Sequence, residues 1–337
     1  MKVVVSEEPG QPVVIKEVDV PEPGPGQVLV KVTATGVCHT DLHAINGDWP
    51  VKPKEHLIPG HEGVGTVVAV GPGVTDLKVG DVVGNAWLGN ACGVCEYCRT
   101  GRETLCESQQ NSGYSIDGSY AEYLLVDSKF AGRIPEGADP NEIAPILCAG
   151  VTVYKGLKQT EVKPGQWVVI SGVGGLGHIA VQYAIAMGMR VVAVDVDPAK
   201  LELAEKMGAE ITVNAREVDR VEAVHEAIGG AHGVLATAVH PTAFSQAMGV
   251  TRRDGAIVLV ALPPGTFEVN IFDVALRGLI IRGSIVGTRQ DLQQAIDLHA
   301  AGKIVPTVSV EDIDEAADVL DRLDKGDVEG KVALSVD

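Results

Sequence analysis

The sequence predicts an α/β protein of two domains, one rich in β-strands and one built on a doubly wound parallel sheet. The chain has 337 residues, 45% of them hydrophobic, which suits roughly two domains with a core each. Its first part alternates short β-branched runs with turns rich in proline and glycine. From Gly165 onward such runs alternate with helical patterns. The order of these patterns predicts a β-rich domain followed by an α/β domain.

Charge and hydropathy restrict the possible partners. The chain carries 27 Lys and Arg against 45 Asp and Glu, a formal net charge of −18. This charge repels nucleic-acid phosphates and anionic lipid, so neither is an expected partner, and it indicates a solvated acidic surface. The apolar start of MKVVVSEEPG is too short for an export signal, and glycines and polar residues interrupt the apolar stretch 168–196. We therefore expect a cytoplasmic protein that does not enter a membrane.

Short strands are expected at the start of the chain. Residues 1–35 contain the runs VVV, PVVIKEV and QVLVKVTATG, separated by turns such as PEPGPG. This pattern predicts antiparallel strands joined by tight loops. Farther on, Gly60-His61-Glu62 precedes the apolar run TVVAV, which places His61 on a loop or at the entry to a buried strand.

The stretch from Gly36 to Gly65 concentrates metal ligands and proton carriers. It contains Cys38, His39, Thr40, Asp41, His43, His61 and Glu62. Thiolate and imidazole are ligands that zinc prefers, and a catalytic zinc site uses three protein ligands and one open position. The stretch therefore predicts part of a zinc site whose remaining ligand comes from elsewhere in the chain.

Four further cysteines lie close together in the segment 90–106. They follow the spacing C-x-x-C-x-x-C-x7-C and are Cys92, Cys95, Cys98 and Cys106. Four thiolates at such separations predict a closed, tetrahedral structural zinc site with no position for substrate. The alternatives are four unrelated reduced thiols or an iron–sulfur cluster, although nothing else in the sequence indicates electron transfer.

The sixth cysteine, Cys148, lies in the apolar segment IAPILCAGVT, where the pattern predicts a helix over residues 143–152. A cysteine in such a segment is most often a small buried hydrophobic residue. A role as a metal ligand is the alternative.

A dinucleotide-binding pattern begins at residue 167. The strand WVVIS runs into a glycine turn and the helical pattern HIAVQYAIAMG, and the strand MRVVAVD then closes on Asp195. The turn residues are Gly172, Gly174, Gly175, Leu176 and Gly177. Glycines in such a turn let the backbone approach a pyrophosphate at the helix N-terminus. Strand, glycine turn, helix, strand and carboxylate together indicate a dinucleotide-binding site.

Asp195 bears on the choice of cofactor. A carboxylate at this position accepts hydrogen bonds from the ribose hydroxyls of adenosine and repels a 2′-phosphate, so NAD is favoured over NADP. Lys200 either flanks the same ribose or is an ordinary surface lysine on the helix that starts at Pro198.

The remaining sequence continues the α/β alternation. Strands are predicted in ITVNA, HGVLATAV and AIVLVAL and in LIIRG, with helices near residues 218–228 and from Pro241. This strand count suits a six-stranded doubly wound sheet. The tail adds two helical patterns, TRQDLQQAIDLHAAGKI and DIDEAADVLDRLDKG, and the strand GKVALSV. Because the β-rich half lacks a closing element, we expect the tail from about Val286 to pack on it.

These motifs resemble the zinc-dependent alcohol dehydrogenases of the medium-chain dehydrogenase/reductase superfamily, of the tetrameric bacterial and yeast type. Gly-Val-Cys-His-Thr-Asp-Leu-His, Gly-His-Glu, the four-cysteine lobe and Gly-Ser-Ile-Val-Gly occur in order along essentially the whole chain. The resemblance implies a GroES-like catalytic domain over 1–150 and 286–337, with a zinc lobe at 90–106. It also implies a Rossmann NAD-binding domain over 151–285, a homotetramer and two zinc ions per chain.

The resemblance also implies a role for individual residues around the catalytic zinc. Cys38, His61 and Cys148 are similar to the three ligands of that zinc. Glu62 looks like the carboxylate behind the zinc, and Asp41 like the residue that orients the ligand histidine. Thr40 and His43 look like the proton relay. Trp49 and Trp87 resemble aromatic walls of the substrate pocket, with ordinary core packing as the alternative.

Cofactor contacts follow from the same resemblance. His39 is similar to a residue beside the pyrophosphate, and Thr152 to one at the nicotinamide face, unless its hydroxyl bonds its own helix backbone. The other implied contacts are Val260, Leu262, Ser284, Val286 and Lys331.

The implied activity is the NAD-dependent oxidation of short-chain primary alcohols to aldehydes, and the reverse, by hydride transfer from a zinc-bound alkoxide. One alternative is a secondary-alcohol or polyol dehydrogenase of the same superfamily. Comparing turnover of ethanol, 2-propanol and sorbitol would distinguish this alternative from the primary-alcohol activity. A remote alternative is an inactive nucleotide-binding protein, which lacks zinc and alcohol turnover.

Two positions depart from the family pattern. Glu55-His56 replaces an apolar residue and a proline, and we expect this pair to face solvent. Lys331 stands where many relatives have an arginine on the pyrophosphate. Lysine keeps the charge but loses the bidentate geometry, so weaker cofactor binding is expected.

Overall fold

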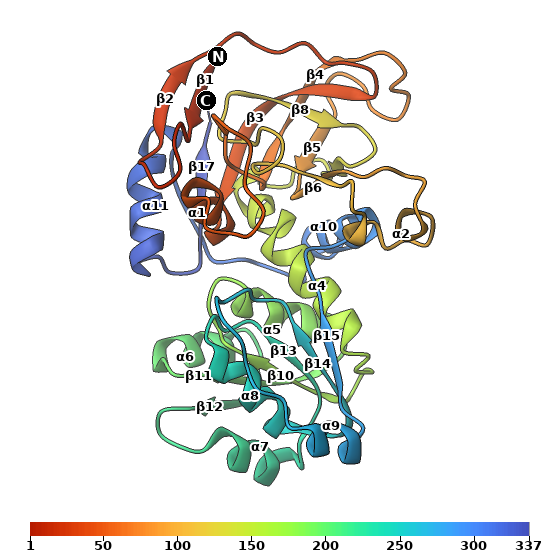
Figure 1. Ribbon diagram of the computed structural model, residues 1–337, viewed down its shortest axis with the longest axis vertical. Helices are drawn as coiled ribbons and strands as arrows, with labels where there is room; N and C mark the ends of the chain where they lie inside the picture. The colour runs from red at the N-terminus through yellow and green to blue at the C-terminus, as the bar shows by residue number, and fades with distance from the viewer. Residues whose placement is uncertain (337) are drawn as a thin grey trace. The chain divides into compact units, whose positions relative to one another are not determined.

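The computed structural model describes residues 1–336 and separates into two compact units (Figure 1). Unit 1 comprises Met1–Cys148, Gly287–Ala300 and the tail from Pro306, and unit 2 comprises Ala149–Val286 and Ala301–Val305. Asp337 lies outside the described residues. Within residues 1–336, no helix is long and apolar enough to span a membrane.

Unit 1 is built on a seven-stranded sheet with the order β16-β17-β3-β4-β5-β9, in which β8 also pairs with β3. Its strands are β3 Gln27–Val37, β4 Gly63–Val70, β5 Val82–Asn85, β8 Tyr123–Asp127, β9 Gly132–Arg133, β16 Val308–Asp312 and β17 Lys331–Ser335. The C-terminal strand β17 pairs antiparallel with β3, with Val332 opposite Val37. The tail of the chain thus returns to the β-rich unit and extends its sheet.

Two small antiparallel sheets complete the strands of unit 1. β1 Lys2–Val5 pairs with β2 Val14–Glu17, and β6 Leu88–Asn90 pairs with β7 Gln110–Asn111. The predicted antiparallel strands at the start of the chain are therefore present, but residues 6–13 and 18–26 join them as longer connections and not as tight loops.

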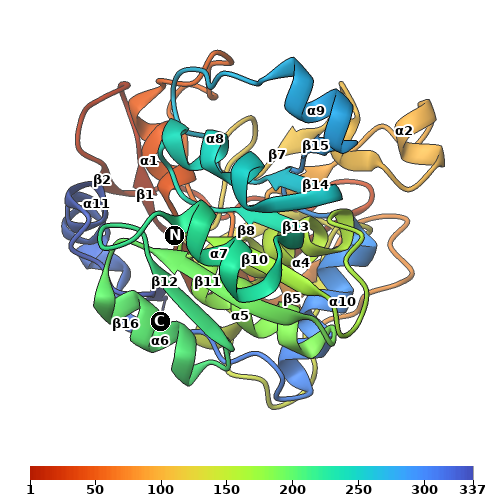
Figure 2. The same ribbon diagram turned by 90° about the horizontal axis from the view of Figure 1, so that it is seen from below.

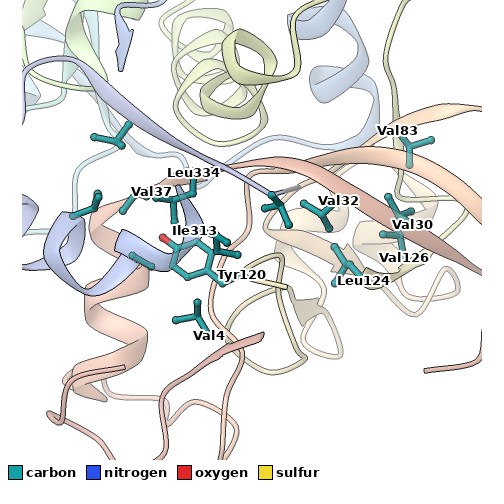
Figure 3. Packing of buried hydrophobic residues seen from close by; sticks show 14 of the residues in the cluster. Val4, Val30, Val32, Val37, Val83, Tyr120, Leu124, Val126, Ile313 and Leu334 are labelled. Carbon is teal, nitrogen blue, oxygen red and sulfur yellow. The ribbon is translucent and has the colours of Figure 1, made fainter. Parts of the chain in front are cut away.

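Alternating apolar residues of these strands form the core of unit 1 (Figure 3). The cluster joins Val30 and Val32 of β3 to Leu124 of β8 and Leu334 of β17. Tyr120 lies fully buried among apolar side chains that include Val4, Val37 and Ile313 (Figure 3). Because apolar burial is the main driving force for folding, this cluster fixes β3 and β4, and Cys38 lies just after the first of these strands and His61 just before the second.

Short helices connect and cover the sheet of unit 1. They are α1 His39–Asn46, α2 Glu96–Arg99, α3 Pro140–Ile143, α10 Arg289–Ala300 and α11 Ala316–Lys325, with 3-10 turns η1 Glu103–Leu105, η2 Ala144–Leu147 and η3 Ile313–Glu315. Helix α1 begins directly after Cys38, whose N–H donates to the Asp41 carboxylate at 2.9 Å. It ends at Gly47, whose φ of 59° is the left-handed conformation that favours glycine.

The predicted continuous helix over residues 143–152 is wrong. Helix α3 ends at Ile143, a 3-10 turn follows, and Cys148 has φ −121° and ψ −73°, outside helical values. Proline at position 145 lacks an N–H and disfavours a continuous α-helix through this segment. Cys148 therefore lies at a break in the helical pattern, just before α4 Ala149–Gln159.

Unit 2 contains six parallel strands in the order β12-β11-β10-β13-β14-β15. They are β10 Trp167–Ser171, β11 Arg190–Asp195, β12 Ile211–Asn214, β13 Ala231–Ala236, β14 Thr251–Leu259 and β15 Ile280–Gly283. Numbered along the chain, this order is 3-2-1-4-5-6, the arrangement of a doubly wound dinucleotide-binding sheet. The predicted sheet and its strand count are confirmed.

Helices pack against this sheet in two groups (Figure 2). α4, α5 Gly177–Ala186 and α6 Pro198–Lys206 contact one another in series, and α7 Arg220–Ile228 contacts α8 Pro241–Val250. The apolar sheet residues that pack with α7 and α8 include Val169, Val192 and Val234.

Among the elements that the sequence did not reveal are α9 Ile271–Arg277 and β16. Helix α9 buries none of its residues, and most of β16 is exposed at the edge of its sheet. Neither segment therefore has the contrast between buried and exposed positions on which periodicity depends.

Candidate metal and cofactor sites

Four side chains from three distant segments converge in unit 1. One ligand atom from each of Cys38, His61, Glu62 and Cys148 lies within 4.8 Å of those of the other three. The Sγ of Cys148 is 3.9 Å from the Sγ of Cys38 and 3.2 Å from Nε2 of His61. The pairing of β3 with β4 brings the first two segments together, with Thr35 opposite Gly63. We call these four residues the mixed cluster.

Asp41 organises the backbone and the histidine of the mixed cluster. Its carboxylate accepts from His61 Nδ1 at 2.9 Å, from the backbone N–H of Cys38 at 2.9 Å and from that of Gly60 at 3.2 Å. The hydroxyl of Tyr120 donates to the same carboxylate at 3.1 Å, and both side chains are fully buried. Because Nδ1 carries the donated proton, the lone pair of Nε2 is directed at the cysteine sulfur.

Glu62 forms a buried ion pair with Lys331. The ammonium of Lys331 donates to Glu62 Oε1 at 2.7 Å and to the carbonyl of Val37 at 2.9 Å. Burial raises the pKa of Glu62 to about 7, although the charge of Lys331 acts to lower it. Within the described residues, Glu62 Oε2 has no hydrogen-bond partner, and it lies where a side chain at Gly36 would collide with it, 1.9 Å from an added Cβ.

The donor chemistry of the mixed cluster fits zinc. Two thiols and one imidazole are borderline-soft ligands of the kind that zinc binds tetrahedrally, and the unpaired Glu62 oxygen lies beside them. The sequence missed the Lys331–Glu62 contact, because nothing local to either residue signals a pairing across 269 positions.

The four cysteines of the lobe also converge. The Sγ atoms of Cys92, Cys95, Cys98 and Cys106 all lie within 4.8 Å of one another. Backbone N–H groups donate to two of these sulfurs, from Cys95 to Cys92 at 3.4 Å and from Cys98 to Cys95 at 3.5 Å. Hydrogen bonds from the N–H groups of Val94 and Cys95 lower the pKa of Cys92 to about 6, which favours the thiolate that a metal requires. Four sulfur donors fit a closed tetrahedral metal site.

An aromatic cluster connects the predicted relay histidine to the mixed cluster. His43 of α1 stacks on Trp49 with ring centroids 5.1 Å apart, and Trp49 meets the edge of Trp87 at 6.0 Å. Trp87 in turn lies edge-on to His61 at 5.5 Å. Tyr114 contacts both tryptophans, at 5.5 and 5.4 Å, and its hydroxyl donates to the carbonyl of Val51. Sequence reasoning missed Tyr114, which no motif singles out.

The polar groups of α1 lie near this aromatic cluster. His43 Nδ1 is 3.0 and 3.1 Å from the two carboxylate oxygens of Asp48, a contact that the sequence did not predict. Thr40 is half-buried one turn earlier on the same helix, whereas His39 is exposed at its start. Glu55 and His56 are both exposed, as predicted.

The glycine turn of unit 2 is shaped by close backbone contacts. Gly172 has φ 104°, and a Cβ on Gly177 would lie 1.9 Å from the carbonyl oxygen of Gly172. Only glycine permits this approach at the start of α5. Asp195 supports the turn, because its Oδ2 accepts from the N–H of Val173 at 2.6 Å and its Oδ1 from that of Val196 at 2.7 Å.

The other predicted cofactor residues of unit 2 differ in burial. Ser284 is buried, and within the described residues its hydroxyl has no hydrogen-bond partner. An unpartnered buried hydroxyl fits a residue that bonds a ligand. Val286 has φ 37°, a conformation rare for β-branched residues. The remaining positions are buried at Thr152 and Val260 and exposed at Lys200 and Leu262.

Comparison with known proteins identifies the family. Residues 24–136 match the alcohol dehydrogenase GroES-like domain, and residues 175–301 match the zinc-binding dehydrogenases. An alcohol dehydrogenase from Moraxella sp. (strain TAE123) is 59% identical over 334 residues, covering 99% of each chain. One from Geobacillus stearothermophilus is 54% identical over 337 residues, covering 100% of each chain. The crystal structure of the alcohol dehydrogenase from Aeropyrum pernix has a TM-score of 0.91 at 34% identity, with 100% of each chain covered.

A GroES-like unit joined to a doubly wound parallel sheet defines a zinc-binding dehydrogenase, which confirms the predicted fold class. Within that class the chain belongs to the alcohol dehydrogenase family. It is an enzyme that acts on alcohols with zinc and a nicotinamide cofactor.

Proposed function

We propose that this enzyme oxidises short-chain primary alcohols to aldehydes with NAD, and catalyses the reverse reaction, at a zinc ion held by Cys38, His61 and Cys148. The observation that carries the proposal is the mixed cluster itself. It offers two sulfurs and one imidazole nitrogen at metal-binding separations, with the imidazole oriented by a buried carboxylate. Three protein ligands leave one position for a substrate oxygen, as a catalytic zinc site requires.

The zinc would supply a Lewis acid that lowers the pKa of the alcohol hydroxyl, and the nicotinamide would accept the hydride. The protein residues supply the rest. Asp41 keeps the proton of His61 on Nδ1, so that Nε2 remains a ligand. Thr40 is assigned to receive the hydroxyl proton of the substrate and His43 to deliver it to solvent, which suits the partial exposure of both side chains.

Asp195 supports the choice of NAD. Both of its oxygens already accept backbone N–H groups of the turn and of the loop after β11, so the carboxylate is fixed at the end of that strand. A 2′-phosphate beside a fixed carboxylate would be repelled, whereas ribose hydroxyls can donate to its remaining lone pairs. The other proposed cofactor contacts are His39, Thr152, Gly172, Gly174, Gly175, Leu176, Gly177, Lys200, Val260, Leu262, Ser284, Val286 and Lys331.

The aromatic cluster supports a small substrate. Trp49 and Trp87 pack against each other and against the histidines of the relay and of the mixed cluster. Large aromatic side chains beside a metal centre narrow the space for substituents on the reacting carbon. We further propose that the four-cysteine lobe holds a second, structural zinc and that the enzyme assembles as a homotetramer.

The test is a comparison of kcat/KM for ethanol, 1-butanol, 2-propanol and sorbitol, each with NAD and with NADP, before and after treatment with a zinc chelator. We expect the highest value with ethanol and NAD, and loss of turnover with loss of zinc. Preference for 2-propanol or sorbitol would replace the substrate assignment with the secondary-alcohol or polyol alternative. Equal use of NADP would overturn the role of Asp195, and Asp195→Ser should itself relax the preference.

A further inference from the structure

We propose that Asp48 is a positioning residue of the proton relay, which holds His43 in the tautomer and orientation that accept a proton at Nε2. The inference rests on the proposed relay through Thr40 and His43. It begins from the contact of His43 Nδ1 with both carboxylate oxygens of Asp48, at 3.0 and 3.1 Å.

The local chain geometry builds this contact. Helix α1 ends in a left-handed Gly47, whose N–H donates to the carbonyl of His43 at 2.9 Å. Directly after this glycine, Asp48 lies beside the imidazole of the last helical turn. The next residue, Trp49, stacks on the same ring at an interplanar angle of 26°. Two consecutive side chains thus fix His43, one through its nitrogen and the other through its face.

Hydrogen-bond chemistry assigns the tautomer. A neutral imidazole has one donor and one acceptor nitrogen, and a carboxylate only accepts. The proton of His43 therefore resides on Nδ1, and Nε2 keeps its lone pair for the relay. When Nε2 takes up the proton released from the alcohol hydroxyl, the positive charge forms next to the Asp48 carboxylate. One proton then leaves the ring to water, and no electrons are transferred.

A contribution to protein stability does not by itself explain the contact between His43 and Asp48. The side chains of His43 and Asp48 are 33% and 48% exposed, and ion pairs at such positions contribute little to the free energy of unfolding. A contact that adds little stability can still matter for orientation, because proton transfer requires close alignment of donor and acceptor. A positioning role for Asp48 therefore predicts an effect on proton transfer, whereas a structural role predicts an effect on stability.

The test uses Asp48→Asn, His43→Gln and the double variant, with Asp76→Asn as a matched change at another exposed aspartate of unit 1. Single-turnover oxidation of ethanol is followed by NADH absorbance and by a pH indicator for proton release. We expect Asp48→Asn to slow proton release about tenfold, within the range of a general acid–base contribution. Zinc content and melting temperature should not change, and Asp48→Glu should restore part of the rate. In the His43→Gln background, Asp48→Asn should have no further effect.

The outcomes separate this inference from the proposed function. If His43→Gln slows proton release and Asp48→Asn does not, the role of Asp48 is overturned and the relay stands. If His43→Gln has no effect, the relay fails and the inference fails with it. An equal slowing by Asp48→Asn with and without His43, or a loss of zinc in Asp48→Asn, overturns the positioning role alone.

Discussion

The two cysteine clusters of this chain are assembled in different ways. The lobe takes all four sulfurs from one short segment, Cys92 to Cys106, and backbone N–H groups of that segment donate to two of them. The mixed cluster joins residues as far apart as Cys38 and Cys148, 110 positions from each other. The first arrangement depends on local loop geometry, whereas the second depends on the sheet and core of unit 1.

The two clusters also differ in the residues that surround them. The lobe offers only thiols, which suits a closed site that stabilises the fold. The mixed cluster includes an imidazole and the buried carboxylate of Glu62, and it lies against the buried carboxylate of Asp41 and an aromatic cluster. In the proposed catalytic site, distant parts of the fold thus supply the ligands, the residue that orients the histidine and the adjoining aromatic side chains together.

Removing one ligand from the mixed cluster should have the largest effect. Cys148→Ala leaves two ligands, so we expect about one zinc per chain to be lost and kcat/KM for ethanol to fall roughly a thousandfold or more, since a Lewis acid stabilises the transition state by several kcal/mol. The zinc of the lobe should remain. Metal analysis by mass spectrometry together with steady-state kinetics measures both effects. Full zinc content in this variant would remove Cys148 from the ligand set.

The matched change in the lobe should affect stability more than activity. Cys92→Ala also loses about one zinc, but we expect the melting temperature to drop by roughly 5 to 10 °C, because metal binding contributes directly to folding. For the folded fraction, kcat/KM should stay within about threefold of the parent value. Calorimetry measures the melting temperature, and the metal analysis and kinetics used for Cys148→Ala measure zinc content and kcat/KM. A thousandfold loss of kcat/KM in soluble, folded Cys92→Ala would contradict the proposal that the lobe is structural and only the mixed cluster is catalytic.

This contrast also explains what the sequence could predict. The lobe follows from cysteine spacing, and the sheet order of unit 2 follows from alternating strands and helices and the glycine turn, all of which are local patterns. The local pattern placed Cys148 in a continuous helix, and only the resemblance to a known family put it beside His61, because that contact exists only after the sheet of unit 1 has formed. Tyr114 and Tyr120 escaped notice for the same reason, whereas Asp48, only five positions from His43, was missed because no motif marks it.

Tyr120 tests whether the hydrogen bonds to Asp41 help to hold His61 in the mixed cluster. Its fully buried hydroxyl donates to Asp41 at 3.1 Å, and in Tyr120→Phe that carboxylate loses one of its four donors. We expect zinc to transfer to a chromogenic chelator roughly tenfold faster from the mixed cluster, as for other groups that hold a ligand indirectly. The rate for the lobe should not change.

Tyr183→Phe is the matched control, since Tyr183 is equally buried in unit 2. It should leave both rates of zinc transfer unaltered. Equal acceleration from both clusters in Tyr120→Phe would point to general destabilisation of unit 1 and not to the orientation of His61 through Asp41.

The smallest expected effect concerns Lys331. Its ammonium pairs with Glu62 Oε1, while Glu62 Oε2 has no partner within the described residues. In Lys331→Arg the planar guanidinium keeps the charge and adds donors in a fork. If residue 331 also contacts the cofactor pyrophosphate, we expect the Kd of NADH to fall about two- to fivefold, as bidentate contacts are the stronger ones. Fluorescence titration with NADH measures this change.

Lys325→Arg, at an exposed position on α11, controls for the exchange of lysine for arginine in general. An unchanged or higher Kd of NADH in Lys331→Arg contradicts a pyrophosphate contact. A higher melting temperature with an unchanged Kd would show that the guanidinium is engaged by both oxygens of Glu62. Residue 331 would then hold Glu62 of the mixed cluster in place and would not contact the cofactor. The same pair of measurements would thus decide whether this buried cation serves the metal, the cofactor or both.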